Sequence, residues 1–137
     1  EEWKIMKRHS EIGAKILEGS DMETLKLGKI IALTHHEKWD GTGYPAGLKE
    51  KSIPVAGRIA AVADVFDALC MPRGYKPKWD PQKARAYILE ESGKSFDPVI
   101  VAAFEKVYED ILKVSAVTDG KTTIIPGITK ELRRTEF

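Results

Sequence analysis

Three histidines and one aspartate are the residues of this sequence whose types best suit metal chemistry. His35 and His36 are adjacent, His9 lies upstream in MKRHSEIG, and Asp64 stands inside the apolar run AAVADVFDAL. Imidazole nitrogens and carboxylate oxygens together suit Fe, Mn, Zn, Ni or Co rather than Ca. These four residues are therefore candidate ligands of divalent transition metals.

Alternatives to a metal site stay open from the residues alone. Histidines are often packed or surface residues, and two adjacent helical histidines point about 100° apart. They share one ion only if it lies in the angle between them, or if two ions are present. Asp64 could instead pair with Arg58 or a lysine, because a carboxylate without a partner is costly to bury. Asp67 lies three residues on, on a neighbouring part of the same helix surface.

The elements that must position these residues are predicted to be helices. Apolar residues at helical spacing predict a helix over residues 22–38, which carries the histidine pair near its end. Shorter helices over residues 1–8 and 10–17 precede it, with Ser10 as the N-cap of the second. The glycines and proline of WDGTGYPAG end the long helix and begin a loop that extends to Ser52.

The second half of the chain repeats one signal for a helix start. Residues 55–71 form the most apolar segment, which predicts a central buried helix. Asp80 and Asp97 each precede a proline, an arrangement typical of a capped helix start, and predict helices to about Glu91 and Lys113. Residues 1–113 are expected to form the domain, and residues 114–137 an extended or poorly ordered tail.

The segment HHEKWDGTGYPAGLK resembles the signature of HD-GYP domains, with Gly43, Tyr44 and Pro45 as the GYP element. MKRHSEIGAKIL resembles the segment before this signature, and IPVAGRIAAVADVFDAL and FDPVIVAAF resemble the segments after it. The resemblance implies an all-α, HD-domain-like helical bundle with a long GYP loop. It also implies a metal-dependent phosphodiesterase that hydrolyses cyclic di-GMP to pGpG or GMP in bacterial signalling.

The resemblance also implies roles for individual residues. His9, His35, His36 and Asp64 match family ligands of two or three metal ions, with iron or manganese expected first and zinc, nickel or cobalt as alternatives. No catalytic residue is assigned beyond these ligands, since adjacent metals can activate a water for in-line attack on phosphorus. The substrate contacts implied are Tyr44, Arg73 and Lys76. Gly43, Tyr44 and Pro45 match a surface that contacts diguanylate cyclase domains.

The sequence departs from the family pattern upstream of MKRHSEIG, where the family carries its His-Asp pair. The chain therefore reads as an N-terminally truncated HD-GYP domain, following a sensor or receiver domain in the complete protein. Because ligands would be missing, we expect little or no activity from these residues alone. The alternative function is a degenerate module that binds cyclic di-GMP or a cyclase partner without hydrolysis.

Composition excludes several other classes of protein. The 22 basic and 21 acidic residues balance to a net charge of +1, which argues against a binder of nucleic-acid polymers. No stretch approaches the roughly 20 apolar residues that span a bilayer, so this segment is not expected to insert into a membrane. Cys70 is the only cysteine, so no internal disulfide forms and a cytoplasmic location is expected.

Overall fold

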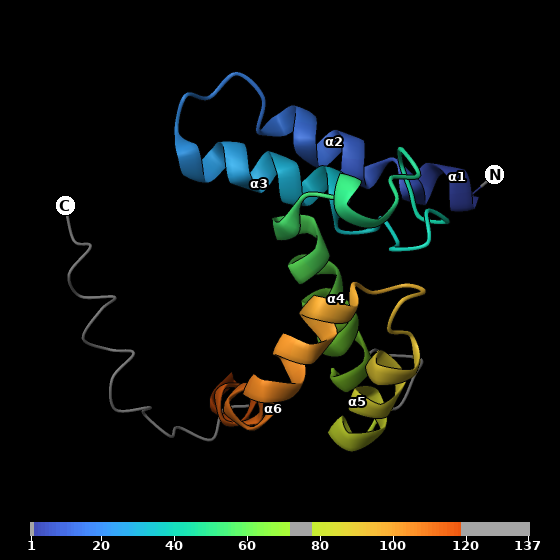
Figure 1. Ribbon diagram of the computed structural model, residues 1–137. Helices are drawn as coiled ribbons and strands as arrows, with labels where there is room; N and C mark the ends of the chain where they lie inside the picture. The colour runs from blue at the N-terminus through green and yellow to red at the C-terminus, as the bar shows by residue number, and fades with distance from the viewer. Residues whose placement is uncertain (1, 72–77, 119–137) are drawn as a thin grey trace. The chain divides into compact units, whose positions relative to one another are not determined.

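The computed structural model describes residues 2–71 and 78–118 of the chain. Its elements are α-helices and one short 3-10 helix, connected by loops (Figure 1). Their bounds are α1 Glu2–Lys7, α2 His9–Ile16, α3 Glu23–Thr34, η1 Glu50–Ser52, α4 Val55–Cys70, α5 Pro81–Glu90 and α6 Pro98–Thr118. No strand occurs within these described ranges, apart from one isolated bridge between Ser92 and Phe96. The predicted all-α class is confirmed.

Contacts divide the chain into two compact units, one from Glu1 to Ala103 and one from Phe104 onward. In the first unit, α2 packs on α3, α3 packs on α4, and α4 packs on α5. Its buried apolar side chains come from α2, α4, α5 and the start of α6, and from two loops. They are Ala14, Ile53, Ala61, Val62, Phe66, Ala84, Ile88, Phe96 and Val101. In the second unit, the rings of Phe104 and Tyr108 meet edge to face at 5.8 Å.

The two Asp-Pro helix starts form as predicted. The Asp80 side chain accepts a hydrogen bond from the Gln82 N–H at 2.8 Å, at the start of α5. The Asp97 side chain accepts one from the Val99 N–H, also at 2.8 Å, at the start of α6. Each carboxylate satisfies a helix N–H that has no partner within the helix.

Other expected boundaries are wrong. Ser10 is not an N-cap, because it lies inside α2 and is buried. Helix α3 ends at Thr34, whose hydroxyl donates to the Ile30 carbonyl at 2.7 Å, so the histidine pair follows the helix. Helix α6 continues to Thr118, beyond its expected end at about Lys113.

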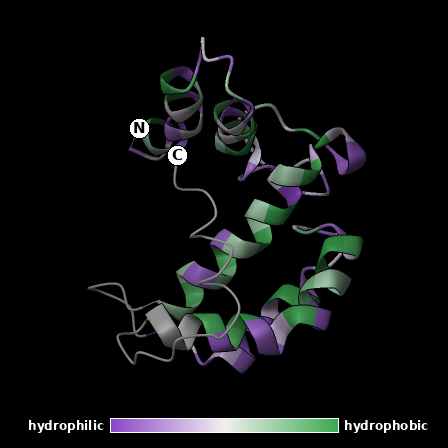
Figure 2. Cartoon of the chain, turned by 90° about the vertical axis from the view of Figure 1, so that its left-hand side faces the viewer, coloured by the Kyte–Doolittle hydropathy of each residue, from purple (hydrophilic) through white to green (hydrophobic). Residues whose placement is uncertain are grey.

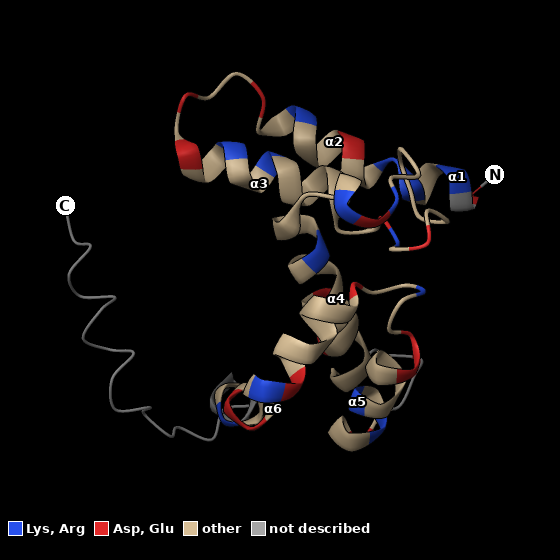
Figure 3. Cartoon of the chain, viewed as in Figure 1, with Lys and Arg blue, Asp and Glu red and all other residues tan. Residues whose placement is uncertain are grey.

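The prediction of a centrally buried helix over residues 55–71 is also wrong for much of α4. Figure 2 shows apolar residues along this helix, and Figure 3 shows that its charged residues are few. Gly57, Ala61, Val62 and Phe66 are buried, which defines one inward stripe. The opposite surface is open, since Ile59 is 51% exposed. Among the described helices, none is both long enough and apolar enough to cross a membrane.

Candidate metal centre

The structure brings the three histidines together. His9 begins α2, His35 caps the C-terminus of α3, and His36 follows it. The Nε2 atom of His9 lies 3.3 Å from Nε2 of His35 and 3.0 Å from Nε2 of His36. One ligand nitrogen from each ring lies within 4.8 Å of the other two. Because the pair follows the helix, both rings reach the same point despite being adjacent in sequence.

Two of the imidazoles are oriented by backbone carbonyls. The Nδ1–H of His9 donates to the Met6 carbonyl at 2.6 Å, and the Nδ1–H of His35 donates to the Ile31 carbonyl at 2.9 Å. A neutral imidazole with its proton on Nδ1 presents a lone pair at Nε2. The two Nε2 lone pairs therefore face each other, which a shared cation would stabilise. Carbonyl partners on the remote ring nitrogen are typical of histidines that ligate metals.

His36 is held in its neutral form. Burial lowers the pKa of His36 from 6.5 to about 4, with further lowering by His35 and His9. The Asp64 carboxylate acts in the opposite direction and is the smallest of these influences. A metal ligand must be the neutral imidazole, so His36 is ready to coordinate across the neutral pH range.

Asp64 lies near this cluster but is not one of its converging groups. It is on α4 and exposed, and its carboxylate oxygens do not fall within the 4.8 Å group that the histidines form. Its charge acts on His36 and also raises the pKa of Tyr44, after the larger effect of burial. The expectation of a buried Asp64 is therefore wrong, and its role as a metal ligand stays a prediction.

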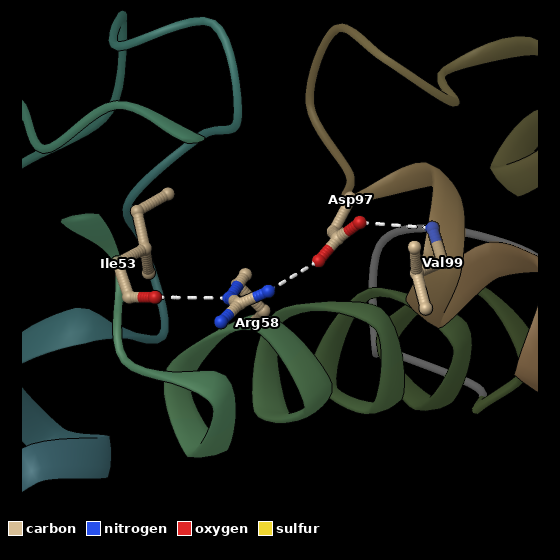
Figure 4. A network of polar contacts seen from close by, with 4 residues as sticks. All are labelled: Ile53, Arg58, Asp97 and Val99. Carbon is tan, nitrogen blue, oxygen red and sulfur yellow. Dashed lines mark hydrogen bonds and ion pairs between the residues drawn. The ribbon is translucent and has the colours of Figure 1, made fainter. Parts of the chain in front are cut away.

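Arg58 does not pair with Asp64. Figure 4 shows its guanidinium between the Ile53 carbonyl and the Asp97 carboxylate. The Nε–H of Arg58 donates to Ile53 at 2.9 Å, and Nη1 lies 2.5 Å from an Asp97 oxygen. Asp97 is 2% exposed, so this is a buried ion pair. The alternative in which Arg58 compensates Asp64 is thereby excluded.

Tyr44 lies against the histidine cluster. Its ring stacks on His36 with centroids 4.7 Å apart and planes 29° apart, and the Lys7 ammonium lies 5.1 Å from the Tyr44 centroid. Gly43 and Pro45 flank it in the GYP loop, which is the name used here for residues 39–52. The other two expected substrate contacts, Arg73 and Lys76, lie outside the described residues.

A cavity of about 130 Å³ opens beside the cluster. Its lining combines the histidine segment with apolar groups of α4, of α5 and of the loop before α6. The lining residues are His35, His36, Glu37, Lys38, Tyr44, Ala61, Val65, Tyr87, Ser95 and Phe96. The cavity therefore offers an apolar recess in direct contact with the ligand candidates.

Residue types alone do not indicate a role for Glu37. This residue is 3% exposed, and its carboxylate accepts hydrogen bonds from the backbone N–H groups of Ala46 and Leu48 in the GYP loop. The available signal was an acidic residue directly after a histidine pair. Its partners are backbone groups, which residue types do not reveal.

Taken together, the fold and the cluster define a helical domain with three converging imidazoles suited to a divalent metal. Residues 1–100 match the family model described as the HD domain. The chain belongs to the HD-domain family, and the expected relation to an HD-type domain is confirmed.

Curated relatives and a solved structure agree with this family. The chain is 49% identical to a cyclic di-GMP phosphodiesterase of Vibrio cholerae and 50% identical to one of Thermotoga maritima, over 85% and 83% of its length. A solved cyclic GMP-AMP-specific phosphodiesterase of Vibrio cholerae is 28% identical, with a TM-score of 0.60 over 85% of this chain. The chain spans 25%, 31% and 25% of those proteins, respectively. The expected HD-like helical bundle is confirmed.

Proposed function

We propose that this chain is part of a metal-dependent phosphodiesterase that hydrolyses cyclic di-GMP. The observation that carries the proposal is the convergence of His9, His35 and His36 at their Nε2 atoms. The cyclic di-GMP phosphodiesterases to which the chain is similar support the reaction. Conversion to pGpG or GMP, in bacterial signalling and in the cytoplasm, is part of the same proposal.

The proposed ligands are the three histidines together with Asp64. They fit a divalent transition metal because two of the rings present unprotonated Nε2 atoms, while their Nδ1–H groups are held by carbonyls. Iron or manganese is proposed first, with two or three ions in the intact domain. When bound, such ions acidify a coordinated water and neutralise charge on the phosphate.

The chain's own residues supply orientation and a recess for the substrate. Tyr44 lines both the cluster and the neighbouring cavity, so it is proposed to contact the substrate. Arg73 and Lys76 are proposed to hold phosphate oxygens, Arg73 through its planar fork and Lys76 as a point charge. The loop containing Gly43 and Pro45 is the proposed contact for a diguanylate cyclase domain.

A second candidate substrate is 3'3'-cGAMP. A 3'3'-cGAMP-specific phosphodiesterase of Vibrio cholerae is 41% identical to this chain over 85% of its length. Both cyclic dinucleotides carry the same phosphodiester ring and differ in one base. The metal centre would therefore cleave the same type of phosphodiester bond in both, and contacts with the differing base would determine which substrate is preferred.

The test uses the natural full-length protein loaded with Mn²⁺ or Fe²⁺ and supplied with each cyclic dinucleotide in turn. We expect faster turnover of cyclic di-GMP. We also expect His36→Ala to lower turnover by more than about 100-fold, since outer-shell partners alone are worth about 10–100-fold. Metal content, measured separately, should fall in the same variant. Tight binding of cyclic di-GMP without any hydrolysis would instead establish the degenerate binding module.

A further inference from the structure

Glu37 is a buried carboxylate that directly follows the histidine pair. One of its oxygens accepts a hydrogen bond from the Ala46 N–H at 2.8 Å, and the other accepts one from the Leu48 N–H at 2.9 Å. No ion pair in the described ranges 2–71 and 78–118 includes this residue. Since a buried charge needs partners, these two amides of the GYP loop are what stabilise it.

The same loop also contacts the backbone of residues 36–38. The Tyr44 N–H donates to the His36 carbonyl at 3.1 Å. Gly43 passes so close that an added Cβ would overlap the Lys38 nitrogen and lie 2.5 Å from the Glu37 Cα. The loop therefore lies directly against the backbone of residues 36–38, and its position is set by these contacts.

This loop position determines what surrounds the His36 ring. Carbonyls hold the Nδ1 atoms of His9 and His35, but within the part of the chain that the structure describes no hydrogen bond reaches Nδ1 of His36. The Tyr44 ring is stacked on the His36 imidazole instead. The plane of the His36 imidazole is therefore set by the rings beside it, which are Tyr44 of the loop, with centroids 4.7 Å apart, and His35, with centroids 4.0 Å apart.

We propose that Glu37 and Tyr44 are positioning residues for the His36 imidazole. The Glu37 carboxylate fixes the loop, and the loop presses the Tyr44 ring against His36, so that Nε2 points toward His9. This contact replaces the hydrogen bond that orients the other two rings. The inference rests on the proposed metal site and adds a supporting role for the GYP loop within it.

The test compares the same chemical change at two glutamates, Glu37, whose carboxylate holds the loop, and Glu50 in η1. Glu37→Gln replaces one acceptor oxygen by an NH₂ group that faces a backbone N–H, so one hydrogen bond is lost. Glu50→Gln is the matched control, because Glu50 is exposed and its side chain makes no hydrogen bond among the described residues. The metal-free natural protein and both variants are titrated with Co²⁺, and the visible absorption bands report affinity and ligand geometry.

We expect Glu37→Gln to bind Co²⁺ about 10–100-fold more weakly with altered bands, while Glu50→Gln matches the unaltered protein. Melting curves in chelator, together with faster amide exchange at Ala46 and Leu48, separate loop release from unfolding. Wild-type affinity and bands in Glu37→Gln would overturn the inference and leave the proposed metal site standing. Absence of Co²⁺ binding by the unaltered protein would overturn both.

A second pair of variants decides the question if Glu37→Gln does not fold. Tyr44→Phe keeps the ring that stacks on His36, whereas Tyr44→Ala removes it. We expect the phenylalanine variant to retain Co²⁺ affinity and the alanine variant to lose about tenfold or more. Equal affinities in these two variants would overturn the role of the ring.

Discussion

At the scale of the residue, the histidine cluster is an arrangement that a metal-free protein tolerates at a cost. When His9 and His35 are neutral with their protons on Nδ1, their Nε2 lone pairs face each other, and burial lowers the pKa of His36 to about 4. A proton shared between two of the Nε2 atoms would give a hydrogen bond to one pair of rings only. A divalent ion could instead bind the nitrogens of all three rings. The cluster is thus better matched to a cation than to hydrogen bonding within itself.

The lowered pKa of His36 predicts how the metal-free protein responds to acid. The unfolded chain takes up this proton near pH 6.5, and the folded chain only near its pKa of about 4. The unfolded state therefore binds more protons between these values, so the free energy of unfolding should fall as pH is lowered from about 6.5 toward 4. Urea unfolding in chelator at pH 7, 6 and 5 measures the slope.

His36→Gln is the control for this pH dependence. Glutamine does not titrate, so the free energy of unfolding should fall less steeply with acid in this variant than in the unaltered protein. His36 is only half-buried, so part of the effect is screened by solvent. Identical slopes in the two proteins would show that His36 does not control acid stability.

The sequence singles out the three histidines that the structure brings together, but not the environment of Asp64. An apolar run rich in alanine predicts a central buried helix, yet α4 buries one stripe and exposes Asp64. Alanine contributes little apolar area, so it does not require burial on every face. Glu37 escaped prediction because its partners, Ala46 and Leu48, act through backbone groups.

At the scale of the element, the Arg58–Asp97 pair joins the start of α4 to the start of α6. Asp97 is both an N-cap and an ion-pair partner, and it is nearly fully buried. Breaking a buried pair by removing one partner leaves an uncompensated charge. We expect Asp97→Ala to lower the free energy of unfolding by about 3 kcal/mol, within the range for such losses. Urea unfolding of the metal-free protein checks this value.

An exposed aspartate on the same helix provides the control. Asp110 contacts Lys113 at 2.8 Å, and its side chain is 73% exposed. Exposed pairs of this kind contribute little, so Asp110→Ala should leave the unfolding curve unchanged. If Asp97→Ala and Asp110→Ala had the same free energy of unfolding, the buried Arg58–Asp97 pair would contribute no more to stability than an exposed one.

The crossing of α3 and α4 depends on Gly57. A Cβ at this position would overlap the Thr34 hydroxyl and lie 2.7 Å from the Thr34 Cβ, directly before the histidine pair. We expect Gly57→Ala to destabilise the protein by about 1–3 kcal/mol, as overpacking typically does. Gly13→Ala on α2 is the control, since its Cβ would meet Ala32 at an ordinary 3.5 Å.

Alanine also favours a helix over glycine, so Gly13→Ala should be neutral or stabilising. Thermal unfolding of both variants distinguishes these effects. A melting temperature that drops equally in the two would point to a loss of glycine flexibility rather than to the close approach at Thr34.

The order of the helices could be predicted from sequence better than their packing. The Asp-Pro pairs at 80–81 and 97–98 determine a helix start locally, because the carboxylate caps the helix and the proline ring fixes φ. Both helices start where predicted. The end of α3 depends on the loop that follows it, which hydrogen bonds back to residues 36–39. Contacts between distant segments of this kind leave no periodic signal.

At the scale of the whole molecule, the cluster ties together segments far apart in the sequence. His9 at the start of α2 and His35 at the end of α3 are separated by 26 positions. An ion bound by both would therefore link the two ends of the α2–α3 segment. A ligand that binds only the folded state stabilises it by mass action, by about 2.7 kcal/mol at a concentration 100 times its Kd. We therefore expect Mn²⁺ to raise the melting temperature of the natural protein progressively with its concentration.

His9→Ala tests whether this stabilisation comes through the cluster. The variant removes one Nε2 and the only ligand candidate on α2, so the metal-dependent rise in melting temperature should largely disappear. Ca²⁺ serves as a further control, because imidazole nitrogens are poor ligands for it. Amide exchange should slow in α2 and α3 on Mn²⁺ addition and change less in α5, which contributes no histidine. An equal rise in the variant and the unaltered protein would place the stabilising ion elsewhere, and the three converging imidazoles would then need another explanation.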